Sequence, residues 1–143
     1  MEIKKNILFG LLFISAFYCS SQSVNKTLIG SWLVKDTRVE SSMIPEEQIA
    51  IIEVMQESFK GAKFTFNADG TFLFTLGPQA ADIMKELLFV NNTNWIYDES
   101  KSYISIGTKS DGYSLMGILV RHKDGMNYFI LDESPIMLHV QKT

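Results

Sequence analysis

The sequence is poor in the residues that carry most thiol and metal chemistry. Its 143 residues include one cysteine, Cys19, and two histidines, His122 and His139. A zinc site needs three or four convergent ligands, and no H-x-H, H-x-x-x-H or H-E-x-x-H spacing occurs. We therefore expect no metal site and no cofactor, and we interpret both histidines as structural or surface residues.

Motifs of covalent catalysis are also missing. The chain has no G-x-S-x-G turn for a nucleophilic serine and no glycine-rich loop for a phosphate group. Its acidic pairs are Glu46-Glu47, Asp98-Glu99 and Asp132-Glu133. Neighbours in the chain point apart, so we expect solvated surface carboxylates rather than acid–base dyads. The sequence therefore predicts a protein that is not an enzyme.

Basic residues are too few to favour nucleic acid as a partner. The chain has 13 Lys and Arg against 16 Asp and Glu, a net charge of −3. Without the first 21 residues the counts become 11 and 15, a net charge of −4. Proteins that bind nucleic acid cluster basic side chains, and no run of five like charges appears here. We expect no nucleic-acid partner.

One long apolar run occurs, ILFGLLFISAFY at residues 7–18, and it follows Lys4 and Lys5. A helix needs about 20 apolar residues to span a bilayer, so this shorter run is typical of a signal peptide. Small residues follow it, and we predict a signal peptide over residues 1–21 that is cut after Ser21. The protein is then exported, either periplasmic or secreted, and only the leader meets the membrane.

Removal of this leader would also remove the sole cysteine. Tyr18 precedes Cys19, whereas bacterial lipidation usually requires a small residue there, so we do not expect a lipid anchor on Cys19. Residues 22–143 then form a single domain without disulfides. Such a domain is held together by its hydrophobic core alone.

Short segments of alternating polarity dominate the remaining sequence. A first strand is predicted at 28–39, and Asn67-Ala68-Asp69-Gly70 is typical of a hairpin turn between strands at 63–66 and 71–76. Five further strands are predicted at 94–97, 102–106, 113–121, 127–131 and 135–140. The pattern predicts a mainly β fold, an up-and-down antiparallel barrel of about eight strands.

Two short helices are expected to interrupt these strands and to lie on the barrel. Pro45 suits the first turn of a helix over 45–60, whose apolar face holds Ile51, Ile52, Met55 and Phe59. A second helix is predicted over 78–89 from helical spacing of Ala80, Ile83, Met84, Leu87 and Leu88.

The start of the first predicted strand, Gly30-Ser31-Trp32, resembles the G-x-W signature of the lipocalins. Two more stretches, FTFNADGTFLF at 64–74 and NWIYDESKSYISI at 94–106, make the chain similar to lipocalin-like domains of exported bacterial proteins of the Bacteroidota type. The resemblance implies an up-and-down barrel that is closed at one end near the tryptophan and often holds an apolar pocket.

The resemblance also implies a basic side chain from the last strand region over Trp32. Lipocalins commonly use an arginine there, whereas the last strand of this chain has Lys142 and the only late arginine is Arg121. Either side chain is a candidate for cation–π packing on Trp32.

Aromatic side chains pose the functional question, because an eight-stranded barrel is wide enough either to be filled or to hold one small ligand. Our first hypothesis is a protein that binds a small apolar or amphipathic ligand. The alternative is a filled barrel that acts as a non-enzymatic protein-interaction or inhibitor module in the cell envelope, marked by an exposed apolar patch. Convergence of the tryptophans and phenylalanines on the barrel centre would favour the alternative. The predicted ligand-binding residues are Trp32, Phe64, Phe66, Phe72, Phe74, Trp95, Tyr97, Tyr103 and Tyr128.

Overall fold

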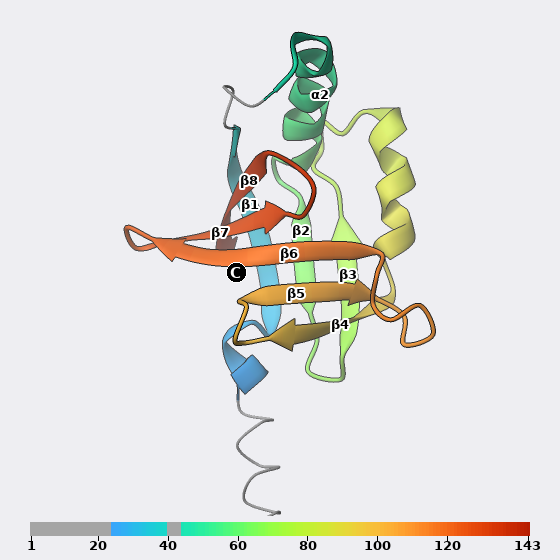
Figure 1. Ribbon diagram of the computed structural model, residues 1–143, viewed down its shortest axis with the longest axis vertical. Coiled ribbons are helices and arrows are strands. Elements are labelled where there is room, and N and C mark those ends of the chain that lie inside the picture. The colour runs from blue at the N-terminus through green and yellow to red at the C-terminus, as the bar shows by residue number, and fades with distance from the viewer. Residues whose placement is uncertain (1–23, 40–43) are drawn as a thin grey trace, which may run out of the picture.

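Eight antiparallel strands form a closed barrel and pair in the order in which they follow along the chain (Figure 1). The computed structural model describes residues 24–39 and 44–143, so the predicted signal peptide and Cys19 lie outside the described residues. The predicted fold class, an up-and-down barrel with two short helices, is confirmed. The strands are β1 (Gly30–Val39), β2 (Lys63–Phe66), β3 (Thr71–Thr75), β4 (Thr93–Asp98), β5 (Tyr103–Gly107), β6 (Met116–Lys123), β7 (Met126–Leu131) and β8 (Ile136–Lys142).

The turn between β2 and β3 is stabilised by its own residues, which is why its sequence predicts a hairpin. Gly70 has a φ of 89°, a backbone conformation that costs glycine little. Its amide donates to Asn67 O at 3.0 Å, and the Asp69 carboxylate accepts from the amide and hydroxyl of Thr71 at 2.9 and 2.6 Å. These bonds from Thr71 lower the pKa of Asp69. The turn therefore fixes the register of the hairpin from within.

The barrel closes between its first and last strands. β1 and β8 pair from Trp32↔Lys142 to Val39↔Ile136, with an irregularity between Val34 and Asp36. This is among the longest ladders in the sheet, whereas β3 and β4 pair only through Thr71↔Asn94 and Phe72↔Thr93. The barrel is therefore held by a long ladder between β1 and β8 and by a short ladder between β3 and β4.

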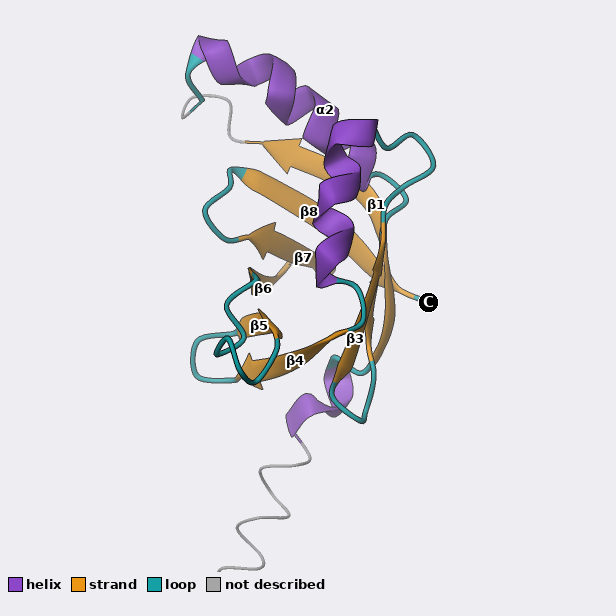
Figure 2. Cartoon of the chain, turned by 90° about the vertical axis from the view of Figure 1, so that its right-hand side faces the viewer, coloured by secondary structure: helices purple, strands orange, loops and turns teal. Residues whose placement is uncertain are grey.

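The first helix covers the upper end of the barrel (Figures 1 and 2). A 3-10 turn, η3 (Glu46–Gln48), leads from Pro45 into α2 (Ile49–Phe59), so the predicted helix lies where expected. Ile52 and Phe59 are buried, but Ile51 is 41% exposed. The prediction that Ile51 faces inward was therefore wrong, because α2 is oriented so that the neighbouring residue, Ile52, faces the barrel.

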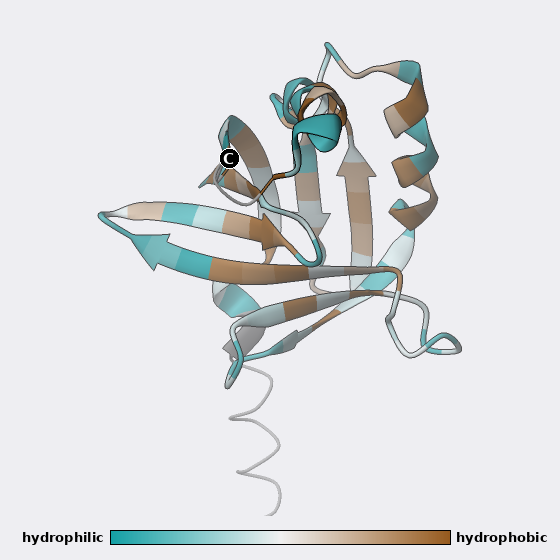
Figure 3. Ribbon diagram, turned by 45° about the horizontal axis from the view of Figure 1, so that its top comes forward, coloured by the Kyte–Doolittle hydropathy of each residue, from teal (hydrophilic) through white to brown (hydrophobic). Residues whose placement is uncertain are grey.

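The second helix, η4 (Asp82–Val90), is a 3-10 helix and begins four residues later than predicted. Because a 3-10 helix has three residues per turn, Met84, Leu87 and Val90 share its inward face. Ile83 is 62% exposed and Leu88 40% exposed, which contradicts the inward positions that α-helical spacing predicted. Apolar and polar segments alternate along η4 in Figure 3. Neither of these helices, nor any other in the described residues, is long and apolar enough to cross a membrane.

Candidate functional site

Aromatic rings converge on the centre of the barrel. The ring of Phe129 lies 5.5 Å from that of Trp32, 5.6 Å from Phe64 and 6.0 Å from Phe66, measured between centroids. Phe66 also packs edge-on against Trp95 at 5.2 Å. Phe64, Phe66 and Phe129 have no exposed surface. Rings in mutual contact at these distances fill the barrel axis with protein.

Helix α2 extends this aromatic core to the upper end of the barrel. Phe59 of α2 lies 6.2 Å from Phe74, which in turn lies 4.9 Å from Phe64 and stacks on Phe72 with an interplanar angle of 11°. Phe59 and Phe72 are fully buried. The structure therefore brings together six of the predicted ligand-binding residues, the two tryptophans and four phenylalanines, as one packed core.

The three predicted tyrosines do not share one face of the sheet. Tyr97 faces inward and is partly buried against the core. Tyr103 and Tyr128 each precede a fully buried residue on their strands, Ile104 and Phe129. Successive side chains of a strand face opposite sides, so these two tyrosines lie on the outer face of the sheet and not in the interior where we expected them, although Tyr128 is only 6% exposed there. Ligand contact by any of the nine residues stays a prediction.

A cleft of about 420 Å³ opens at the rim of the barrel, where the helices meet the strand ends. Its apolar wall is formed by Met55 and Phe59 of α2, Leu87 of η4 and Met116 at the start of β6. The cleft continues over the rim onto the outer surface, where its edge is polar. Of the nine predicted residues, Tyr103 alone lines this cleft.

The polar edge is built around a hydrogen bond that crosses a glycine. The Tyr103 hydroxyl donates to Asp132 Oδ2 at 2.7 Å. The phenol ring passes over Gly117, where an added Cβ would lie 1.7 Å from the Tyr103 oxygen. Burial, the hydrogen bond to Asp132 and the nearby charge of Glu133 together raise the pKa of Tyr103 to about 12. Tyr103 is therefore a protonated donor at neutral pH.

The loop between β5 and β6 forms the facing wall of the cleft and is held by one carboxylate. Asp111 accepts from the Thr108 hydroxyl at 2.7 Å and from the Ser114 amide at 3.0 Å. These bonds lower the pKa of Asp111. The loop keeps Tyr113 at a φ of 56°, which is why β6 begins at Met116 rather than at residue 113, where we predicted it.

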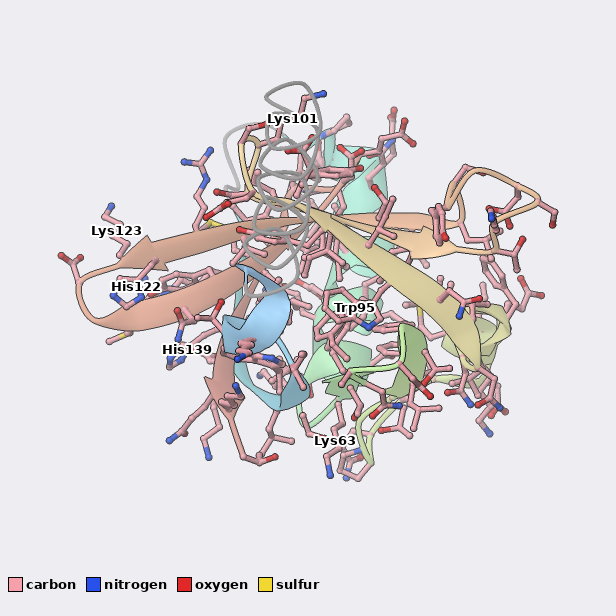
Figure 4. All side chains as sticks on the ribbon, turned by 90° about the horizontal axis from the view of Figure 1, so that it is seen from below. Lys63, Trp95, Lys101, His122, Lys123 and His139 are labelled. Carbon is pink, nitrogen blue, oxygen red and sulfur yellow. The ribbon has the colours of Figure 1, made fainter. Side chains whose placement is uncertain are left out.

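Another aromatic and basic cluster lies on the outer surface of β1, β7 and β8. The ring of Tyr128 lies 5.6 Å from that of His139, and the Arg38 guanidinium lies 5.9 Å from the Tyr128 ring centroid. Figure 4 shows His122 and Lys123 on the protruding β6–β7 hairpin, away from Trp95. In the described residues no three His, Cys, Asp or Glu side chains are grouped as ligands for a metal ion.

The structure also answers which basic side chain covers Trp32. Lys142 Nζ lies 5.6 Å from the Trp32 ring centroid and donates to Thr27 O at 3.2 Å. The Trp32 indole donates to Leu28 O at 2.9 Å. Gly30 has a φ of 127°, and an added Cβ there would lie 2.9 Å from Lys142 Cε. The glycine of the G-x-W stretch therefore leaves room for the lysine that packs on its tryptophan.

Comparison of the chain with protein-family models, curated protein sequences and solved structures gives no match. Function therefore has to be inferred from the geometry and chemistry of the cleft.

Proposed function

We propose that the protein binds one small amphipathic molecule in the rim cleft and performs no covalent chemistry on it. The cleft itself carries this proposal, because its volume of about 420 Å³ falls within the roughly 300–1,000 Å³ of small-molecule sites. The aromatic core occupies the barrel axis, so the ligand lies across the rim rather than deep in the barrel.

The walls of the cleft suit a ligand with an apolar body and a polar end. Met55 and Met116 supply adaptable apolar surface, while Tyr103 and Asp132 place polar atoms at the outer edge. The proposal includes export and kinship with the lipocalins. The apolar leader supports the first, and the packing of Lys142 on Trp32 supports the second.

A titration with the neutral fluorescent probe N-phenyl-1-naphthylamine tests the proposal. We expect saturable binding, and we expect Leu115→Glu to weaken it about fivefold or more, since Leu115 lines the cleft and would no longer offer apolar surface. Ile96→Glu is the matched control, because Ile96 is a similarly exposed apolar residue that does not line the cleft. Absence of saturable binding, or equal losses in the two variants, would contradict the proposal.

The filled core also favours our second candidate function, contact with a protein partner. Ile83, Leu88 and Phe89 leave an apolar outer face on η4, with Ile83 62% and Phe89 57% exposed. Cross-linking in extracts of the host should then depend on this face and be lost in the variant with Ile83→Asp and Phe89→Asp. Cross-links that persist in the variant would exclude η4 as the contact.

A further inference from the structure

We infer that the rim cleft selects amphiphiles with a protonated amine at the polar end and disfavours carboxylates. This inference rests on the proposed function and specifies its ligand class. Asp132 and Glu133 are the charged side chains among the described residues that line the cleft, and none of these lining residues is Lys, Arg or His. Because both charges are negative, the cleft attracts a cation and repels an anion.

Four hydrogen-bond donors at the polar edge are already used within the protein. The single proton of the Tyr103 hydroxyl is directed at Asp132. The Asp132 amide donates to Gly117 O at 2.9 Å, and the Glu133 amide donates to Asp132 Oδ1 at 3.0 Å. Likewise, the Ser114 hydroxyl donates to Asp111 O at 2.9 Å. A ligand carboxylate would therefore find few donors here, chiefly the hydroxyls of Tyr113 and Ser134, which also line the cleft.

The acceptors at the same edge have capacity to spare. A carboxylate can accept about four hydrogen bonds, and each oxygen of Asp132 accepts one from within the protein. The Tyr103 oxygen also keeps its lone pairs. An ammonium group carries three donors and no acceptor, so its pattern complements an edge that offers mainly acceptors and negative charge.

The polar edge of the cleft lies next to its apolar wall, as an amphiphile with an ammonium end requires. The backbone at Glu133 has a φ of 60°, and the turn after β7 places Asp132 and Glu133 beside the apolar wall from Leu131 and Met116. An alkyl chain can lie on that wall while its ammonium meets the carboxylates at the rim. Tyr103 holds Asp132 in place through the bond across Gly117.

Three ligands with the same chain length test the inference: octylamine, octanol and octanoate, each displacing N-phenyl-1-naphthylamine at pH 7 and low salt. We expect octylamine to bind about tenfold more tightly than octanoate, with octanol between them, since partly exposed charges attract and repel only modestly. Asp132→Asn should bring the two charged ligands closer together in affinity, because it removes one of the two negative charges, and should change the affinity for octanol less than that for either charged ligand. The amide oxygen can still accept from one of the two donors that Asp132 binds, the Tyr103 hydroxyl or the Glu133 amide.

Asp124→Asn is the matched control, because Asp124 lies in the β6–β7 turn and not in the cleft lining. It should leave the order of affinities unchanged. If octanol binds but octanoate binds as tightly as octylamine, the inference is overturned and the proposed function stands. If neither the probe nor any of the three ligands binds, both are overturned. If Asp124→Asn and Asp132→Asn reduce the preference for octylamine over octanoate equally, the inference is also overturned.

Discussion

Phe129→Ala is the substitution that most directly tests whether the barrel axis is filled. The Phe129 ring is fully buried among Trp32, Phe64 and Phe66. Its removal leaves about 100 Å³, which at about 24 cal/mol per Å³ of residual cavity costs about 2.4 kcal/mol in addition to the lost transfer free energy. We therefore expect the free energy of unfolding to fall by about 3–5 kcal/mol, the usual range for Phe→Ala in a core.

Urea denaturation followed by circular dichroism measures this loss. With a slope of about 1.5–2 kcal/mol per M, a loss of about 4 kcal/mol lowers the midpoint by about 2–3 M. Ile130→Ala is the control, because Ile130 is the next residue on β7, faces outward and is only partly buried. We expect it to cost about 1 kcal/mol or less.

The cavity itself gives a second measurement. A dry apolar cavity of about 150 Å³ binds benzene or xenon, so the smaller cavity of Phe129→Ala should gain binding of xenon that the unsubstituted protein lacks. A loss below about 1 kcal/mol, equal to that of Ile130→Ala, would refute the reasoning. It would mean that the ring is not enclosed and that the barrel axis has room for a ligand.

Three further predictions concern the rim and the base of the barrel. The pKa of Tyr103 is about 12 in the folded protein against an ordinary 10.0, so the folded state holds this proton more tightly and stability should fall as the pH rises from 10 to 12. In Tyr103→Phe the urea midpoint should depend less on pH across this range. The same pH dependence in the variant and in the unsubstituted protein would contradict the raised pKa of Tyr103. Asp111→Ala should release the rim loop and speed amide exchange at Tyr113, and unchanged exchange rates would show that Asp111 does not hold it. Lys142→Met should cost about 0.5–1 kcal/mol by removing the charge from the Trp32 ring, while Lys142→Arg keeps it. Equal urea midpoints for the two variants would refute the cation–π contact.

The strands were predictable because alternation of polar and apolar residues is a local signal. The turn at 67–70 carries its own hydrogen-bond partners, so its sequence alone predicted the hairpin. The inward face of η4 was not predictable, since Met84 and Leu87 fit both α and 3-10 spacing and only packing against the barrel selects the tighter helix.

The face of the sheet on which Tyr103 and Tyr128 lie could have been predicted from their neighbours. Tyr103 alternates with Ile104 and Ile106, and Tyr128 stands next to Phe129, so one member of each adjacent pair had to face outward. The rim cleft carried no comparable signal, because its lining comes from α2, η4, the β5–β6 loop and the turn after β7. Only the tertiary fold brings these segments together.

The pairing of β1 with β8 has a consequence for the rate of folding. Lys142 and its acceptor Thr27 are 115 residues apart in the chain, so closing this seam requires a large loss of chain entropy before its contacts can form. The β2–β3 hairpin forms from nearby residues and can precede it. Folds that depend on such distant pairings are slower to form than folds with local contacts alone. Until β8 docks, Trp32 lacks its lysine and β1 presents a free edge to other chains, so the last strand to join protects the molecule from aggregation.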